Sequence, residues 1–242
     1  MLRPICSCAV EAQWKVLQHG PIEALSDRVC VVEGALPGMP LKRTMTAVKL
    51  DDGSVVVHSA IALDPSTQKE LEAWGMPRLL IVPCAWHRLD APAYKTRYPD
   101  IRIFCPEGAE RRVAKVVPVD GTYDALPATP PLAIRYLDGV ARREGYLEVH
   151  DDAGTTLVFN DAVFNLEHFP GSFGFVYKLI GSSGGPKVPR LVKLAMVRDH
   201  RSLRAHLTKL AETPNLRRVI MSHGARVESD PGDFLRQVAA TL

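Results

Sequence analysis

The stretch "TTLVFNDAVFNLEHF", from Thr155 to Phe169, places a carboxylate directly after an apolar strand. Residues 156–159 combine β-branched, aliphatic and aromatic side chains, which favour a buried strand. Asp161 follows two residues later. An acid at this point is either a turn or helix-cap residue, or a metal ligand or catalytic base at the carboxyl end of a strand. Other strand ends along the chain bear on this choice.

The composition indicates a globular protein with a sizeable core. The chain has 242 residues, of which 46% are hydrophobic and 24% are charged, and its net charge is +3. The short basic clusters "AERRVAK" (109–115) and "ARREG" (141–145) are interpreted as solvated faces. Because no dense Lys/Arg block with interleaved aromatic residues occurs, we expect no nucleic-acid partner.

Cysteine usage and hydropathy favour a cytoplasmic protein. The five cysteines include one close pair, "CSC" at Cys6 and Cys8, and no second pair completes a zinc-finger spacing. The N-terminal apolar stretch meets Glu11 too early for a signal peptide, and no apolar run approaches the roughly 20 residues of a membrane span. We therefore expect reduced thiols and no membrane partner.

The first half of the chain reads as a hairpin followed by alternating helices and strands. Residues 1–40 are expected to be irregular apart from a strand at "VCVVEGALPG" (29–38), whose exposed edge could support a homodimer. Runs at 44–49 and 55–59, joined by "DDG", form the clearest hairpin. "DPSTQKELEAWG" is a helix that Ser66 or Thr67 caps and Gly75 ends. "PRLLIVPC" and "DIRIFCPEG" are strands, with a short helix at "APAYKTRYP" between them.

The second half repeats this order loosely. "GYLEVHDDAGTTLVFNDAVF" (145–164) is a hairpin, and "GSSGGPKVP" (181–189) is a flexible loop. Asp199 caps an amphipathic helix whose His200 and His206 are expected to face solvent. "NLRRVIMSHG" (215–224) is the last strand, and Asp230 caps a terminal helix with Pro231 at its first position. The chain is thus predicted to be one α/β domain with mixed sheets and helices outside them.

Four residues at predicted strand ends could carry chemistry: His58, His87, Asp161 and His223. Imidazole and carboxylate suit a borderline metal such as zinc. Lone histidines are more often core or surface residues than ligands, however, so each of these histidines could instead have only a structural role. Cys84, three residues before His87, could be a reactive thiol, but a buried small residue is the better interpretation.

Taken in order, these strand ends resemble the metallo-β-lactamase superfamily. The hairpin "RTMTAVKLDDGSVVVHSAI", the strand ending in "CAWHRLDA", "TTLVFNDAVF" and "LRRVIMSHG" carry the resemblance over most of residues 41–242. More narrowly, the hairpin, the aspartate and the closing "HG" are similar to a bacterial branch with no assigned function. The resemblance implies an αββα sandwich, two stacked mixed sheets flanked by helices.

The metal motif departs from that superfamily. Where His-x-His-x-Asp-His is expected, the chain has "CAWHRLDA", so the resemblance implies that the first metal site is lost in its usual form. His87, Asp161 and His223 could still hold one zinc, iron or manganese ion, with Asp90 or His58 orienting a ligand or accepting a proton. We favour a degenerate site that binds a small molecule without metal chemistry. The alternative is a single-metal hydrolase that uses metal-bound water.

Overall fold

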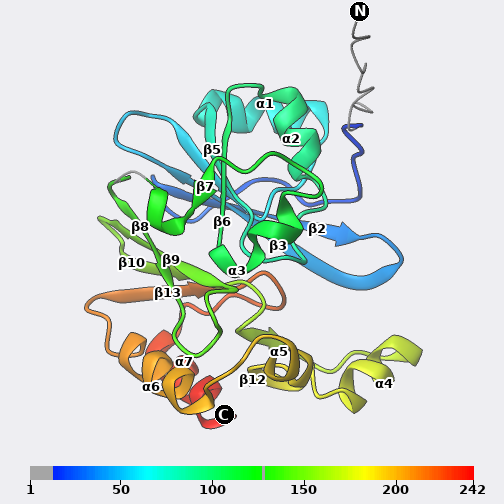
Figure 1. The fold of residues 1–242 in the computed structure, drawn as a ribbon, viewed down its shortest axis with the longest axis vertical. Helices are drawn as coiled ribbons and strands as arrows, with labels where there is room; N and C mark the ends of the chain where they lie inside the picture. The colour runs from blue at the N-terminus through cyan, green and yellow to red at the C-terminus, as the bar shows by residue number, and fades with distance from the viewer. Residues whose placement is uncertain (1–12, 127–128) are drawn as a thin grey trace, which may run out of the picture.

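The computed structural model describes residues 13–126 and 129–242, so the cysteine pair at positions 6 and 8 lies outside the described residues. Two sheets stack face to face, with α1 and α2 outside the first sheet and α6 and α7 outside the second (Figure 1). The predicted αββα sandwich is therefore confirmed. None of the helices in the two described ranges combines the length and apolar character needed to cross a membrane.

The first sheet holds seven strands in sequence order, antiparallel from β1 to β4 and parallel from β4 to β7. Its strands are β1 (Glu23–Ala24), β2 (Val29–Leu36), β3 (Met39–Lys49), β4 (Val55–His58), β5 (Pro77–Ile81), β6 (Arg102–Cys105) and β7 (Gly121–Thr122). The predicted hairpin is the β3–β4 pair, in which Lys49 is the partner of Val55.

Within residues 13–40, the strand predicted at 29–38 is confirmed as β2, and β1 and the start of β3 add strands where the sequence predicts an irregular segment. β2 pairs with β3 from Val29↔Val48 to Leu36↔Met39, so the strand expected at 29–38 belongs to a long hairpin rather than to an edge. The ladder forms because Val29 to Val32 are all buried. The exposed edge falls to β1, which is only two residues long.

The second sheet has the order β13-β10-β9-β8, and a two-stranded sheet pairs β11 with β12. These strands are β8 (Leu132–Tyr136), β9 (Gly145–Asp151), β10 (Gly154–Val158), β11 (Phe164–Leu166), β12 (Gly185–Lys187) and β13 (Leu216–Ile220). The loop expected at 181–189 is thus partly a strand. Gly184 and Gly185 adopt left-handed φ angles of 99° and 85°, and this turn lets β12 fold back onto β11.

The helices are α1 (Pro65–Trp74), α2 (Ala91–Arg97), α3 (Glu107–Val113), α4 (Gly171–Leu179), α5 (Arg190–Ala195), α6 (His200–Leu210) and α7 (Pro231–Ala240), with a 3-10 turn at Tyr123–Ala125.

The predicted cap of α1 is wrong by two or three positions. Asp64 accepts hydrogen bonds from the amides of Ser66 and Thr67, which places the cap before the proline at the first helical position.

Two further predictions near the C-terminal helices need correction, and one is confirmed. Asp199 caps α6 by accepting from the Ser202 amide, as predicted. Asp230 occupies the N-cap position before Pro231, as predicted, but it has a left-handed φ of 50° and its side chain forms no capping hydrogen bond. His206 does not face solvent: its side chain is 13% exposed, and its Nδ1 accepts from the Asp138 amide at 3.0 Å.

Three apolar layers hold the sandwich together. The middle layer joins the two sheets through residues such as Val56 and Phe104 on one side and Val149 and Ile220 on the other. A second layer lies between the first sheet and α1–α3. A third lies between the second sheet and α5–α7 and contains Leu157 of β10. Burial of β10 from both sides makes it a rigid support for the residues that follow it.

We expect Leu157→Ala to lower the free energy of unfolding by about 2–5 kcal/mol, because it leaves a cavity at a fully buried position. Leu194→Ala is the matched control, since the Leu194 side chain is 80% exposed, and should change stability by less than about 0.5 kcal/mol. Urea denaturation measures both. Equal effects of the two substitutions would contradict this assignment of the core.

Candidate metal centre

The parallel pair β10–β13 brings Asp161 and His223 together. Val158 is the partner of Ile220 at the carboxyl end of the pair, and each chain continues for three more residues to reach Asp161 and His223. Because Asp161 and His223 each follow a paired residue by three positions, their side chains lie at the same height beyond the carboxyl end of the β10–β13 pair. Gly224 follows with a φ of +98°, and a Cβ there would lie 2.2 Å from the Asn165 carbonyl oxygen, so the closing "HG" needs its glycine.

The third member of the cluster, His87, comes from the other sheet. It lies in the segment after β5 and before α2, and its side chain is only 7% exposed. Its Nε2 is 3.1 Å from Asp161 Oδ1 and 3.2 Å from His223 Nε2, and His223 Nε2 is 3.4 Å from Asp161 Oδ1. The structure therefore brings together the three residues predicted as metal ligands.

Hydrogen bonds on the far side of each ring fix both imidazoles. His223 Nδ1 lies 2.7 Å from the Lys42 carbonyl oxygen, which only accepts, so Nδ1 carries a proton and Nε2 is the nitrogen that faces the cluster and could bind a metal. The Nδ1 of His87 lies 2.8 Å from the Ser59 hydroxyl. Ser59 has a φ of 58°, a conformation that a residue with a side chain rarely adopts and that often marks a functional site.

The carboxylate of Asp161 is held in its charged form. Burial raises its pKa, but the neighbouring His87 and the hydrogen bonds to both histidines outweigh burial, and the pKa lies well below its usual value. Its second oxygen, Oδ2, accepts from the Cys84 thiol at 3.0 Å. Burial, together with the nearby Asp161 and Glu144 carboxylates, raises the pKa of Cys84 well above its usual value, so the thiol stays protonated and unreactive.

Glu144 supports the loop that carries Asp161. It is fully buried, and its two carboxylate oxygens accept from the amides of Asp161 at 3.1 Å and Ala162 at 2.8 Å. Burial, and then the charge of Asp161, raise the pKa of Glu144 well above its usual value. Cys84, Glu144 and Asp161 form a second group whose ligand atoms lie within 4.8 Å of one another.

Asp90 and His58, predicted to assist the cluster, lie outside both groups. Asp90 forms a buried ion pair with Arg43 and accepts from the Ala62 amide. His58 ends β4, is 1% exposed, and has no partner for its Nδ1 among the described residues. Burial and the nearby His87 lower the pKa of His58 to about 3, so its neutral ring is a poor proton acceptor. Ser59, not His58, contacts His87.

The three ligand atoms fit a tetrahedral zinc ion. Zinc–nitrogen and zinc–oxygen distances near 2.0–2.1 Å in a tetrahedron imply ligand–ligand separations of about 3.3–3.4 Å. The observed separations are 3.1, 3.2 and 3.4 Å. Two neutral imidazoles and one carboxylate are also a donor set that zinc accepts, and they leave a fourth position open.

An apolar cavity of about 320 Å³ adjoins the cluster. His87, Asp161 and His223 form part of its wall, and the remaining lining is mainly apolar and aromatic: Leu36, Met39, Leu41, Trp86, Leu89, Phe164, Tyr177, Ile180, Leu191 and Val192. A few converging polar groups in an apolar wall are typical of a small-molecule site.

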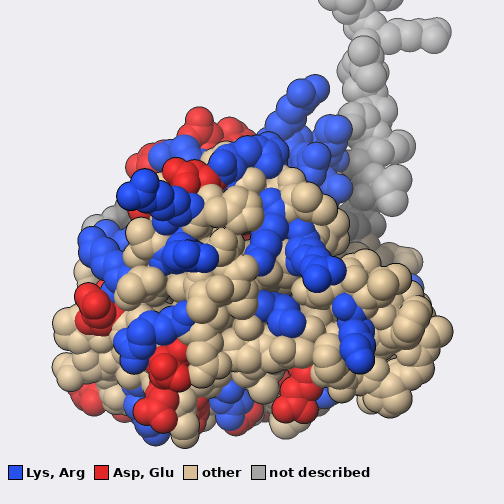
Figure 2. Space-filling model, turned by 90° about the horizontal axis from the view of Figure 1, so that it is seen from below, with Lys and Arg blue, Asp and Glu red and all other residues tan. Residues whose placement is uncertain are grey.

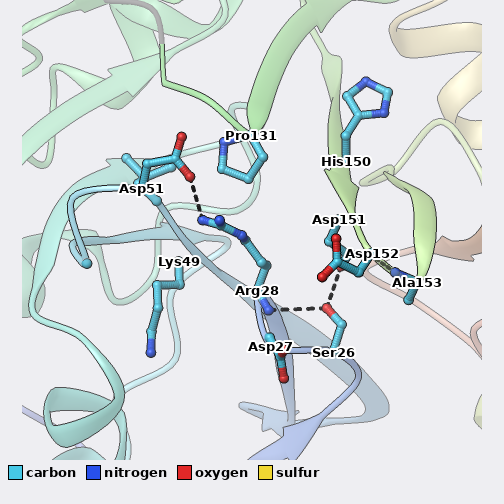
Figure 3. Close-up of a pocket in the computed structure, with 12 residues that line it drawn as sticks. Ser26, Asp27, Arg28, Lys49, Asp51, Pro131, His150, Asp151, Asp152 and Ala153 are labelled. Atoms are coloured by element: carbon cyan, nitrogen blue, oxygen red, sulfur yellow. Dashed lines mark hydrogen bonds and ion pairs between the residues drawn. The ribbon is translucent and has the colours of Figure 1, made fainter.

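A larger cavity, of about 770 Å³, lies between the β2 end and the β9–β10 turn and lacks this character (Figure 3). Arg28 points toward Asp51 and pairs with it at 2.7 Å, while Ser26 donates to Asp151. Lys49 and His150 point away from these pairs (Figure 3). Among the described residues, no side chain of this cavity belongs to a group of converging metal-ligand atoms, so the His87–Asp161–His223 cluster is the stronger candidate for chemistry.

We expect Asp90→Asn to lower the free energy of unfolding by about 3–5 kcal/mol, because it leaves the Arg43 guanidinium buried without a counter-ion. Asp100→Asn removes an exposed carboxylate and should change stability by less than about 0.5 kcal/mol. Chemical denaturation compares the two. Unchanged stability of Asp90→Asn would show that Asp90 has a role other than this ion pair.

Comparison with known proteins supports the architecture at the level of structure. No protein-family model matches the chain, and no curated protein matches it by sequence. A metallo-β-lactamase from Pontibacter korlensis superposes with a TM-score of 0.62 at 11% identity, covering 93% of this chain and 100% of that one.

Two further solved structures give the same result. The DIM-1 metallo-β-lactamase exposed to ceftazidime has a TM-score of 0.63 at 12% identity, covering 94% of this chain and 99% of that one. The FIM-1 enzyme from Pseudomonas aeruginosa, in its mono-zinc form, has a TM-score of 0.61 at 13% identity, covering 91% and 96%. The resemblance seen in the sequence is therefore confirmed in three dimensions: the chain has the metallo-β-lactamase fold.

Proposed function

We propose that the chain binds one zinc ion through His87, Asp161 and His223 and hydrolyses a small molecule held in the adjoining apolar cavity. The observation that carries this proposal is the near-equilateral triangle of ligand atoms, with sides of 3.1, 3.2 and 3.4 Å. A zinc ion held there would act as a Lewis acid and lower the pKa of water to about 7.

The chain's own residues prepare this site before any substrate arrives. Lys42 and Ser59 fix the rings of His223 and His87, and Glu144 fixes the backbone at Asp161. The apolar wall beside the cluster lowers the local dielectric, which would strengthen electrostatic interactions with a bound substrate. The mono-zinc form of the structurally similar FIM-1 enzyme agrees with a site for a single ion.

The second candidate is a small-molecule binding site without metal. In that state a proton on His87 Nε2 would bridge Asp161 Oδ1 and His223 Nε2, while His87 Nδ1 would accept from Ser59. The short distances among His87 Nε2, Asp161 Oδ1 and His223 Nε2 are therefore compatible either with a shared metal ion or with a shared proton. The buried Arg43–Asp90 pair favours this candidate, because it engages the carboxylate of the "CAWHRLDA" segment itself, which is then not available as a metal ligand.

Metal analysis separates the two candidates. Protein purified without a histidine tag should contain about one zinc ion per chain by elemental analysis, and Asp161→Ala should remove it, since two histidines alone rarely retain zinc. Protein that is folded and metal-free, and whose unfolding temperature does not rise when zinc is added, would leave only the metal-free candidate.

Removal of the Ser59 hydroxyl should weaken zinc binding by about tenfold to a hundredfold, because His87 loses the contact that orients its ring. We expect this from Ser59→Ala in a competition titration with a chromogenic chelator. Thr46→Val is the control: Thr46 is equally buried and its hydroxyl has no partner within the described residues, so zinc affinity should not change. A Ser59→Ala affinity equal to that of Thr46→Val would contradict the role given to Ser59.

A further inference from the structure

A third cavity, of about 440 Å³, is lined in part by Cys84, Ala85 and Trp86, which belong to the segment that carries His87. It is formed by α3, by the turn before β9 and by the end of α5. Its charged lining residues are all arginines: Arg112, Arg143 and Arg198. Two of these come from "AERRVAK" and "ARREG", the clusters that the sequence suggested were solvated faces. Arg111, Arg112 and Arg142 are exposed, as that interpretation predicts, and Arg112 and the half-buried Arg143 also line this cavity.

These guanidiniums are not neutralised by the protein. None of the three forms an ion pair with any carboxylate in residues 13–126 and 129–242; Arg143 donates to the Ala195 carbonyl oxygen and Arg198 to that of Val197. Like charges that line one cavity without a counter-ion repel one another. This arrangement differs from the cavity of Figure 3, where Arg28 is paired.

The acids near these arginines do not line the cavity: Glu110, two residues before Arg112 on α3, is exposed and lies outside the lining, and three others are engaged elsewhere. Glu107 pairs with Arg142, on the turn before β9. Glu144 accepts the amides of the Asp161 loop, and Asp199 caps α6. The positive charge of the cavity is therefore available to a ligand.

The backbone around Arg143 is arranged to bring it to the cavity. Ala141 and Arg142 both adopt left-handed conformations, with φ angles of 51° and 54°, which cost energy in residues with side chains. Gly108 of α3 approaches this turn so closely that a Cβ would lie 2.8 Å from Arg143 Cγ, and its amide donates to the Arg142 carbonyl oxygen at 2.9 Å.

The arginine cavity adjoins the candidate metal centre. Cys84 lines it and also donates to Asp161, so the two regions share one side chain. Trp86 lines both this cavity and the apolar cavity over the cluster, and its ring is 44% exposed. Arg88 donates to the Arg112 carbonyl oxygen, which ties the His87 segment to α3.

We infer that the arginine cavity is a subsite for a phosphate group, or another oxyanion of at least two negative charges, on a small molecule. Planar guanidinium groups bind phosphate oxygens with paired hydrogen bonds, and three such groups suit a dianion better than a monocarboxylate. On the face seen from the side of α6 and α7, Lys and Arg side chains are more widespread than Asp and Glu side chains, and this excess of positive charge would attract such a ligand (Figure 2). The suggestion that this phosphate belongs to the substrate of the metal centre rests on the proposed function. The binding of phosphate in the arginine cavity is independent of that function.

The test is a calorimetric titration of the full chain with inorganic phosphate, and with acetate for comparison. Phosphate should bind, and acetate should bind at least about tenfold more weakly. Arg143→Gln should raise the Kd for phosphate by about tenfold or more, and Arg112→Gln, which changes an exposed residue of α3, should act in the same direction. Arg111→Gln is the matched control: it removes the same charge from the next position of α3, outside the cavity lining, and should change the Kd by less than about twofold.

A metal-ligand variant separates this inference from the proposed function. His223→Ala, which removes one candidate ligand, should bind phosphate as tightly as the unchanged protein, whether or not that protein contains zinc. Four results would overturn the subsite: no phosphate binding, equal binding of acetate, equal effects of Arg111→Gln and Arg143→Gln, or loss of binding in His223→Ala with retention in Arg143→Gln and Arg112→Gln.

Discussion

The hydrogen bonds between the buried Glu144 carboxylate and the amides of Asp161 and Ala162 are the constraint on which the candidate site depends. A strand that leaves a sheet exposes backbone amides that need partners, and a buried amide without one is costly. Glu144 supplies acceptors for two successive amides at that point. The direction of the Asp161 side chain, and with it the position of the cluster, follows from this contact.

The same residue also connects the two cavities beside the cluster. Glu144 faces the Asp161 loop, whereas its neighbour Arg143 lines the arginine cavity. Successive residues of an extended chain point to opposite sides. One short turn can therefore place Glu144 at the Asp161 loop and Arg143 in the arginine cavity. The left-handed conformations of Ala141 and Arg142 show that this turn is held in place against its local preference.

Most of the fold could be predicted from the sequence because its signals are local. The β3–β4 hairpin follows from "DDG" between β-rich runs, and α6 follows from Asp199 and the spacing of Leu203, Leu207 and Leu210. His87, Asp161 and His223 could be identified because each lies just beyond a strand. The cap of α1 was misplaced because Asp64, Ser66 and Thr67 are all capable of capping, and only the position of Pro65 at the first helical turn decides among them.

The contacts that support the cluster could not be predicted in the same way. Ser59 and His87 are 28 residues apart, Glu144 and Asp161 are 17 apart, and the Lys42 carbonyl oxygen and His223 are 181 apart. A backbone carbonyl has no sequence signature at all. Asp90 is predicted to assist the site because it lies in "CAWHRLDA", where the resemblance implies the metal motif, but its partner Arg43 lies 47 residues away on β3. Only the packing of the sheets shows that His87 joins the cluster whereas Asp90 forms an ion pair with Arg43.

The equal three-residue offsets of Asp161 and His223 from the paired Val158 and Ile220 make the centre more fragile than the scaffold. Insertion or deletion of a single residue after either strand would turn one ligand to the opposite side while leaving the ladder and the apolar layers intact. A protein with this architecture can therefore lose the three-residue cluster in one genetic step without losing its folded state.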